Sequence, residues 1–479
     1  MKAMSVSGAP FSSSTEIQSQ NDRSTRRLGA IVAATLCILP LLLVLGILWK
    51  EATGLPLADD YHAVLVFALD QRHLSAGEKL LSVVTAQHNE YKLIFEHALV
   101  AADLAATGRL NMALLVWLGN LFLVPLGFIY WLQFRPDDSA GRRLLLFAPL
   151  CWLLFQLTYA ELLDWAMEGL VGIAVVFFSV AALYLLTRSS RGSFVWACIF
   201  GGLAACSSAN GFLVAAVGAG ILLLQRRLLR LVPWIVTFGV ALAAYLYRYS
   251  PADHGGTPAS LPMKLLFFSS FLGGAIENMH GFPVHHAAIV LGVGMLLVYA
   301  HSIWSGYYKR QPFIVATATW AILTALMTAW VRSSLGLGLS LSSRYKIYST
   351  LLIVFCYQYL ADRVIASELF SLRAKRAVYS IVLAVAVLFA LASDVVGMKL
   401  LRTRRAEAIT ALGWYLSDPQ THSPFSGEHG RPDETRDVTG NAIEARRSLT
   451  EALALGIYQI PLKDRVEACA NRPCNRPAR

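Results

Sequence analysis

Charged residues are scarce in this chain of 479 amino acids. Only 15% of the residues are charged, against roughly 25% in an average soluble domain, whereas 56% are hydrophobic. This composition excludes a soluble enzyme, a disordered protein and a secreted disulfide scaffold. The apolar residues form long blocks, and a block of about 18 or more predicts a membrane-spanning helix. The chain is therefore predicted to be an all-α polytopic membrane protein.

A concentrated basic patch is also missing, although the formal net charge is +11. The Lys and Arg residues are spread over short segments between apolar blocks, which is typical of cytoplasmic loops. We therefore expect the lipid bilayer, and not a nucleic acid, to be the partner of this basic chain.

Cysteine is rare outside the apolar blocks. Five of the seven cysteines lie in predicted spans, where we expect small core residues. The other two, Cys469 and Cys474, lie near the C-terminus and form either one local disulfide or two free thiols. The sequence also lacks a metal-ligand spacing as specific as HExxH and the internal repeat of many transporters.

About eleven spans are predicted, after a Ser-, Gln- and Asn-rich N-terminus (1–27) that we expect to be disordered. The first apolar run is too long for a signal-peptide core and no small-residue cleavage site follows it. The membrane domain is predicted over 28–393, with spans at 28–49, 111–134, 144–160, 170–187, 194–208, 211–225, 232–249, 284–304, 313–331, 347–362 and 377–393. The fifth and sixth spans are short, and between them we expect a tight turn or a re-entrant pair.

Loop charge predicts the orientation of these spans. Lys and Arg are concentrated in alternate loops, at 135–143, 188–191, 226–230, 309–310 and 363–376. The intervening segments hold most acids and nearly all histidines; they are 50–110, 161–169, 250–283 and 332–346. The positive-inside rule then predicts a cytoplasmic N-terminus, a large first periplasmic loop with amphipathic helices (50–110), and a periplasmic C-terminal tail (394–479) with a small helical cap near 444–455.

The first outer loop opens with an acidic pair, Asp59-Asp60, about ten residues beyond the first span. Adjacent side chains point in different directions, so one carboxylate can act as a base while the other is a helix cap or a ligand. Alternatively, the pair only caps a helix that starts near Tyr61.

A second polar set follows in the same loop. Its members share one face if this segment is an amphipathic helix lying on the membrane, and they are His88, Lys92, Glu96 and Asp103. The alternative is a solvated polar face. A divalent cation held by this set is left open, because the spacing matches no specific metal motif.

Acids recur in the second and third outer loops. Glu161, Asp164 and Glu168 would line one helix face, and three like charges are costly unless a cation lies nearby. The third loop carries Glu277 and His280. The alternative interpretation is that these are ordinary exposed loop residues.

The fourth outer loop holds cations where the positive-inside rule does not expect them, namely Arg332, Arg344 and Lys346. Arg can hold a phosphate by bidentate, charge-assisted hydrogen bonds; the alternative is that these side chains only snorkel to headgroups. Carboxylates and phosphate-binding cations on one face suit a lipid-linked sugar phosphate. Its leaving phosphate needs no protonation, so one carboxylate base suffices, and cations stabilise the departing charge.

The layout of about residues 28–395 resembles the GT-C superfamily of integral membrane glycosyltransferases that use polyprenyl-phosphate sugars. Asp59-Asp60 stands where that superfamily carries its acidic motif. The stretches Gln87-His88-Asn89-Glu90 and Ser343-Arg344-Tyr345 resemble those of bacterial GT-C-like proteins of unassigned acceptor.

The resemblance implies an inverting glycosyltransferase of the bacterial inner membrane with its active site facing the periplasm. The enzyme would move a sugar from a polyprenyl phosphate to a cell-envelope glycan, lipid or protein. Asp59 or Asp60 would be the base, and Arg344, with Tyr345, Lys346 and Arg332, would hold the donor phosphate. Further substrate-binding candidates are His88, Asn89, Glu90, Glu161, Asp164, Glu277 and His280. The competing hypotheses are a transporter or flippase of a lipid-linked glycan and a non-catalytic membrane assembly protein.

Overall fold

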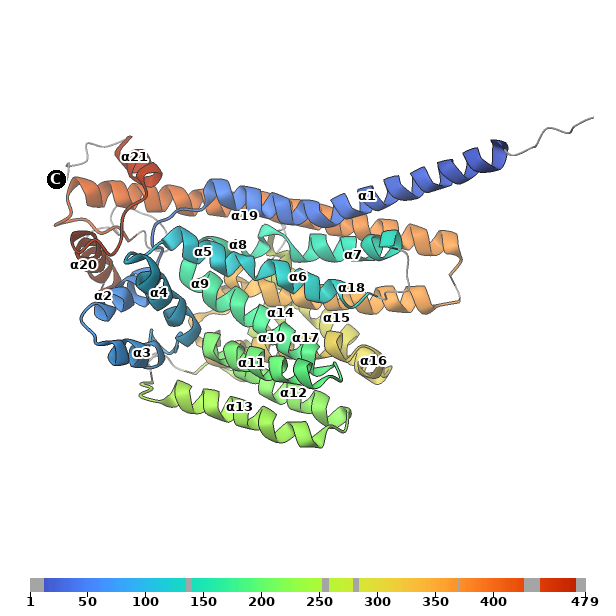
Figure 1. Cartoon of the computed structure of the whole chain (residues 1–479), viewed down its shortest axis with the longest axis horizontal. Helices are drawn as coiled ribbons and strands as arrows, with labels where there is room; N and C mark the ends of the chain where they lie inside the picture. Colours follow the sequence, from blue (N-terminus) through green and yellow to red (C-terminus); the bar gives the residue numbers. More distant parts are fainter. Residues whose placement is uncertain are drawn as a thin grey trace, which may run out of the picture.

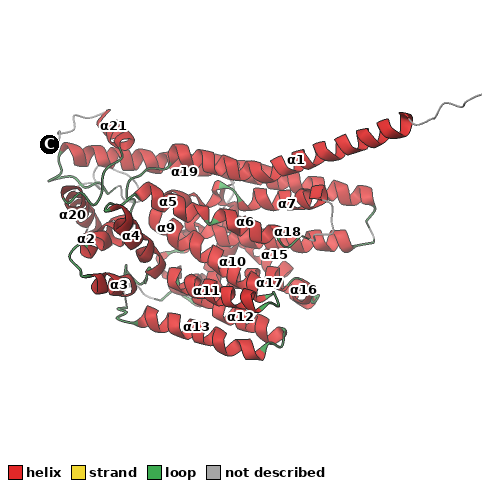
Figure 2. Cartoon of the chain, in the orientation of Figure 1, coloured by secondary structure: helices red, strands yellow, loops and turns green. Residues whose placement is uncertain are grey.

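The computed structural model describes residues 13–134, 140–251, 258–278, 284–368, 370–425 and 440–470. In these ranges the chain is helical, without β-strands other than two isolated bridges (Figure 2). Nine helical segments of the described chain are long and apolar enough to cross a membrane. The predicted all-α class is confirmed, and the nine segments agree with a multi-pass membrane protein.

The candidate spans combine α-helices with short π and 3-10 turns. They are Leu28–Glu51 within α1 (Ser13–Glu51); α5 (Met112–Leu121) with α6 (Leu123–Trp131); α7 (Ala140–Leu154) with η2 (Leu157–Tyr159) and α8 (Ala160–Asp164); α9 (Ala166–Glu168) with η3 (Gly169–Ile173) and α10 (Ala174–Leu186); α13 (Leu228–Leu246); α15 (Val284–Trp304); α17 (Pro312–Arg332) with η6 (Ser333–Leu335); η8 (Ser343–Tyr345) with α18 (Lys346–Ala366); and α19 (Leu372–Ser417).

Shorter elements complete the described chain. They are η1 (Tyr61–Val66), α2 (Phe67–Gln71), α3 (Ala76–Thr85), α4 (Ile94–Thr107), α11 (Arg191–Ser207), η4 (Ala209–Phe212), α12 (Leu213–Leu224), α14 (Leu261–Leu272), η5 (Gly274–Asn278), α16 (Tyr307–Arg310), η7 (Leu337–Leu341), α20 (Gly440–Ala454) and α21 (Leu462–Ala470).

The predicted fifth and sixth spans correspond to α11 and α12, which are 17 and 12 residues long. They meet in the tight turn expected there. A Cβ on Gly211 would lie 2.0 Å from the Ala204 carbonyl oxygen, so this turn requires glycine.

Segment 250–283, predicted as an outer loop, contains the apolar helix α14. This helix packs closely on α15, since a Cβ on Gly273 would lie 1.9 Å from the Ala288 oxygen and one on Gly292 would lie 2.0 Å from the Ser269 oxygen. Small residues allow helices in a membrane to approach in this way. With only 12 residues, α14 is too short for the apolar-run criterion, which explains why the sequence did not predict it.

Residues 50–110 and the described part of the tail lie at the same end of the bundle, where α2, α3, α4, α20 and α21 gather (Figure 1). They form a second apolar core, which includes Leu65, Val100 and Leu449. The two segments are also tied by hydrogen bonds from Tyr458 Oη to the Gly54 oxygen, 2.7 Å, and from Leu110 N to the Ile457 oxygen, 2.7 Å. We call this the capped end, and the opposite end of the bundle the open end.

Two predicted boundaries fall inside helices. The tail boundary at 394 lies within α19, which continues for 46 residues and carries the chain to the capped end (Figure 1). The helix α1 begins at Ser13, within the segment predicted to be disordered, while 1–12 lie outside the described residues. The helical cap predicted near 444–455 corresponds to α20.

Candidate functional site

The two carboxylates of the acidic pair lie in different environments. Asp60 is buried; its Oδ2 accepts a hydrogen bond from Leu57 N at 3.0 Å and its Oδ1 accepts one from Met167 N at 2.9 Å. Burial raises the pKa of Asp60 to about 7, against the opposing effect of these two bonds. Because both oxygens are engaged, Asp60 fastens the first loop to α9.

Asp59, in contrast, can be reached from outside, with 38% of its side chain exposed. Burial tends to raise its pKa, but the hydrogen bond and charge of His88, together with the charges of Arg344 and His62, outweigh burial and lower the pKa. Asp59 is therefore an ionised carboxylate that a ligand can approach.

A histidine pair connects Asp59 to the C-terminal tail. His88 Nε2 lies 3.6 Å from Asp59 Oδ1, and the Nδ1 atoms of His88 and His62 are 2.7 Å apart. On the far side, His62 Nε2 lies 3.6 Å from Glu444 Oε1 on α20. Burial, and next the charge of His88, lower the pKa of His62. In a hydrogen bond between the Nδ1 atoms of His88 and His62, one nitrogen carries the proton and the other accepts it. The four side chains Asp59, His88, His62 and Glu444 thus form a continuous row of polar contacts.

The segment that carries His88 is a tight turn and not the predicted helix. His88 and Tyr91 exchange backbone hydrogen bonds of 3.0 and 2.8 Å, and Asn89 has a left-handed φ of 49°. Asparagine adopts this conformation more readily than most residues. The prediction that His88 and Lys92 share a helical face with Glu96 is therefore wrong, because α4 begins only at Ile94. The Nδ2 atom of Asn89 lies 3.0 Å from His88 Nε2.

Lys92 is fully buried just before α4. Its Nζ donates to the Thr85 carbonyl at 2.6 Å and to the Arg248 carbonyl at 3.3 Å, and burial lowers its pKa. Lys92 thus connects the first loop to the end of α13.

The second outer segment is also not a continuous helix. The chain is extended at Trp165, with φ −112° and ψ 121°, so Glu161, Asp164 and Glu168 do not line one face as predicted. Asp164 accepts a hydrogen bond from Arg404 Nε of α19 at 2.9 Å. The expected compensating cation is present for this acid, but it comes from the predicted tail.

The other two acids of this segment face the fourth loop. Glu161 Oε2 accepts hydrogen bonds from Ser342 Oγ at 3.0 Å and from Arg344 N at 3.1 Å. Glu168 Oε1 accepts one from Arg344 Nη1 at 3.0 Å. The Nε atom of Arg344 is buried without a hydrogen-bond partner in the described chain, so the guanidinium retains an unused donor.

The other predicted phosphate-binding residues have partners of their own. Arg332 forms an ion pair with Glu90 and donates to Tyr91 Oη at 2.6 Å. The buried Lys346 forms an ion pair with Glu277. The ring of Tyr345 packs on Phe271, with centroids 5.2 Å apart. The predicted candidate His280 lies outside the described residues.

Glu96 belongs to this cluster although it was not among the predicted catalytic or substrate-binding residues. It is buried and neither carboxylate oxygen has a hydrogen-bond partner in the described chain. Burial, with the nearby charges of Asp60, Glu168 and Asp59, raises its pKa well above the ordinary range. Burial therefore favours the protonated form of Glu96. The sequence signal for this residue is an acid among the apolar residues of α4.

Chemically, the cluster offers an accessible base, a histidine chain beside it and a guanidinium with a spare donor. Among the described residues no group of three or more His, Cys, Asp or Glu side chains could hold a metal ion. Cys469 is disulfide-bonded, while Cys474 lies outside the described residues.

Comparisons with family models, curated proteins and solved structures found no match to this chain.

Proposed function

We propose that the chain is an inverting glycosyltransferase of the bacterial inner membrane. The enzyme would take its sugar from a polyprenyl phosphate and transfer it to a cell-envelope acceptor, with the capped end facing the periplasm. The observation that carries the proposal is Asp59, an exposed and ionised carboxylate beside a histidine pair and within electrostatic reach of Arg344.

In the proposed reaction Asp59 accepts the proton of the acceptor hydroxyl while the hydroxyl oxygen attacks the anomeric carbon. The bond from that carbon to the phosphate oxygen breaks, and its electron pair leaves with the polyprenyl phosphate, which gains one negative charge. Attack from the face opposite the phosphate inverts the anomeric centre. A base must lie within about 3 Å of the hydroxyl that it activates, and His88 holds Asp59 for this task.

Arg344 is proposed to hold the donor phosphate through the exposed part of its guanidinium, since 28% of its side chain is accessible. Glu168 then competes with the phosphate for this guanidinium. Arg332, Tyr345 and Lys346 are proposed to assist Arg344. The two cations among them can bind the phosphate fully only if they release their carboxylate partners, Glu90 and Glu277.

The test is incubation of the purified protein with a panel of polyprenyl-phosphate sugars and cell-envelope acceptors, with sugar transfer as the readout. We expect one donor to be consumed. Arg344→Ala should weaken donor binding about ten- to a hundredfold, since a charged hydrogen bond contributes roughly 1.5–3 kcal/mol. Arg344→Lys should rescue binding only in part, because the planar fork is lost.

Two further variants separate binding from folding. Glu168→Gln removes the competing charge and should tighten donor binding, which a purely structural ion pair would not do. Arg109→Ala, at an exposed arginine of the first loop, should leave binding unchanged. Movement of an intact donor across a vesicle membrane without sugar transfer would instead support a flippase and overturn the proposal.

A further inference from the structure

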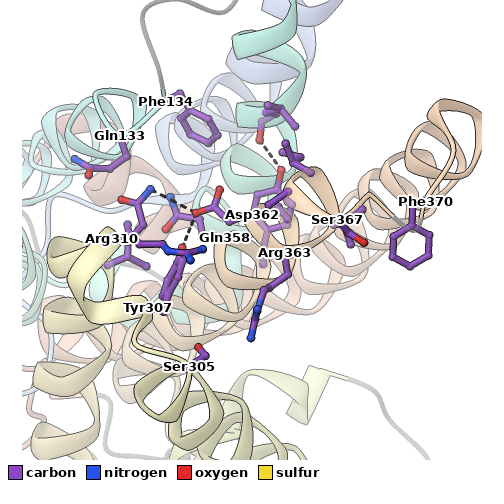
Figure 3. A pocket seen from close by; sticks show the side chains of 18 of the residues that line it. Gln133, Phe134, Ser305, Tyr307, Arg310, Gln358, Asp362, Arg363, Ser367 and Phe370 are labelled. Carbon is purple, nitrogen blue, oxygen red and sulfur yellow. Dashed lines mark hydrogen bonds between the residues drawn. The ribbon is translucent and has the colours of Figure 1, made fainter.

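A cavity of about 1000 Å³ lies at the open end of the bundle. Its walls come from α7, α16, the start of α17 and the end of α18, and they include Tyr307, Arg310, Asp362 and Arg363 (Figure 3). Helix α18 has 21 residues, and at about 1.5 Å per residue its two ends are about 30 Å apart. The cavity is therefore separate from the carboxylate cluster, which surrounds the other end of the same helix.

The described lining of this cavity is basic. It contains three arginines, Arg142, Arg310 and Arg363, and one acid, Asp362. The Oδ2 atom of Asp362 accepts a hydrogen bond from Tyr307 Oη at 2.7 Å, which fixes this carboxylate against α16. Neither Arg310 nor Arg363 forms an ion pair with a carboxylate in the part of the chain that the structure describes.

Arg363 is held in place by aromatic and imidazole groups. Its Nε donates to Tyr359 Oη at 3.3 Å, and its guanidinium carbon lies 5.6 Å from the centroid of that ring. The Tyr359 hydroxyl is in turn 2.6 Å from His301 Nδ1. These contacts orient the guanidinium of Arg363 and do not use its two terminal nitrogens. Such a planar group can donate two parallel hydrogen bonds to the oxygens of a phosphate.

An apolar groove meets the cavity at Arg363. The groove, of about 490 Å³, is lined by Leu297, Val298 and Leu360 together with the Tyr359, His301 and Arg363 side chains. Leu297 and Leu360 are 66% and 53% exposed, on two helices that are candidate membrane spans. A polar cavity and an outward-facing apolar groove that share one arginine fit a molecule with an anionic head and a hydrocarbon chain.

We propose that the open end binds a membrane lipid through its phosphate headgroup. Arg310 and Arg363 receive the phosphate in the cavity, and the hydrocarbon chain follows the groove along Leu297 and Leu360. This site is independent of the proposed glycosyl transfer, because it shares no residue with the carboxylate cluster.

The test measures binding of phosphatidic acid to the full-length protein in phosphatidylcholine nanodiscs, by native mass spectrometry after release. The double variant Arg310→Gln and Arg363→Gln should lose about ten- to a hundredfold in affinity for phosphatidic acid. Arg373→Gln, at an exposed arginine of α19 outside the lining, should bind as the wild type does. Because Arg310 and Arg363 are surface side chains, the variants should keep the thermal stability of the wild type.

Two further ligands distinguish the contribution of the phosphate headgroup to binding from that of the hydrocarbon chains. Diacylglycerol, which lacks the phosphate, should not be retained, and glycerol 3-phosphate, which lacks the tails, should bind far more weakly than phosphatidic acid. Leu360→Asn should weaken lipid binding without changing binding of glycerol 3-phosphate. Equal binding of phosphatidic acid by the double variant, or glycerol 3-phosphate binding as tight as lipid binding, would overturn the proposal.

Discussion

Arginines at the two ends of the bundle have different partners. At the capped end Arg332, Arg344 and Arg404 each contact a carboxylate that comes from a segment at least 176 residues away in sequence. At the open end Arg310 and Arg363 have no carboxylate partner in the described chain. The first group connects loops to one another and to α19, whereas Arg310 and Arg363 make no such connection. In the two proposals, Arg344 meets a phosphate in competition with Glu168, while Arg310 and Arg363 meet one without a competing carboxylate.

The largest effect on stability should come from the buried pair of Arg404 and Asp164. Arg404→Ala leaves the Asp164 carboxylate, which is 5% exposed, without its cation. Breaking a buried pair in this way costs about 3–5 kcal/mol, and thermal unfolding should show a large decrease in Tm.

Arg373→Ala, at an exposed arginine near the start of the same helix, is the control. Arg373 forms no ion pair with another described residue, so its removal leaves no buried carboxylate without a cation, and a surface substitution of this kind changes stability by about 0.5 kcal/mol or less. Equal losses of stability in the two variants would contradict the structural role given to the buried ion pair of Arg404.

A smaller loss is expected at Gly397, where α19 crosses the bundle. A Cβ at this position would lie 2.3 Å from Leu157 Cβ, so Gly397→Ala must push the two segments apart. Overpacking of this kind costs about 1–3 kcal/mol. Gly46→Ala, with no atom within 4 Å of the new Cβ, should be neutral or slightly stabilising. The measurement is the Tm of both variants, and an unchanged Gly397→Ala Tm would contradict this packing.

The smallest effect concerns the dependence of stability on pH. Burial raises the pKa of Glu96, so its contribution to stability is complete below the pKa of the unfolded chain and is lost as the pH rises through the folded pKa. Glu96→Gln cannot ionise. The Tm of this variant, minus that of the wild type, should therefore increase between pH 5 and pH 8. A constant difference would mean that Glu96 is not a buried neutral acid.

Much of the fold could be predicted from the apolar blocks, because a span of hydrocarbon thickness leaves a local signal in the sequence. The signal was lost where helices are shorter than that thickness. Thus α14, of 12 residues, lies in a segment that the apolar pattern predicts to be a loop. The spans predicted at 194–208 and 211–225 correspond to α11 and α12, of 17 and 12 residues, which are shorter than the nine candidates.

The sequence predicts which polar residues belong to the candidate site, but it does not predict which of them contact one another. The polar residues of four loops do gather at one end, around Asp59, Glu168 and Arg344. The sequence could not show that Asp60 is buried while its neighbour is exposed, because that difference depends on Met167, 107 residues away. For the same reason the sequence does not point to Arg404 or Glu444, because their partners are distant in sequence.

The most direct test of the account compares Asp59→Asn with Asp60→Asn in sugar transfer and in thermal unfolding. Asp59→Asn should keep the wild-type Tm and bind donor, but lose about 10²–10⁴ in transfer rate, as expected for loss of a positioned base. Asp60→Asn should lower the Tm, because an amide cannot accept both backbone hydrogen bonds. Asp70→Asn, at an exposed carboxylate of α2, should change neither quantity. Near-normal transfer by Asp59→Asn would contradict the account.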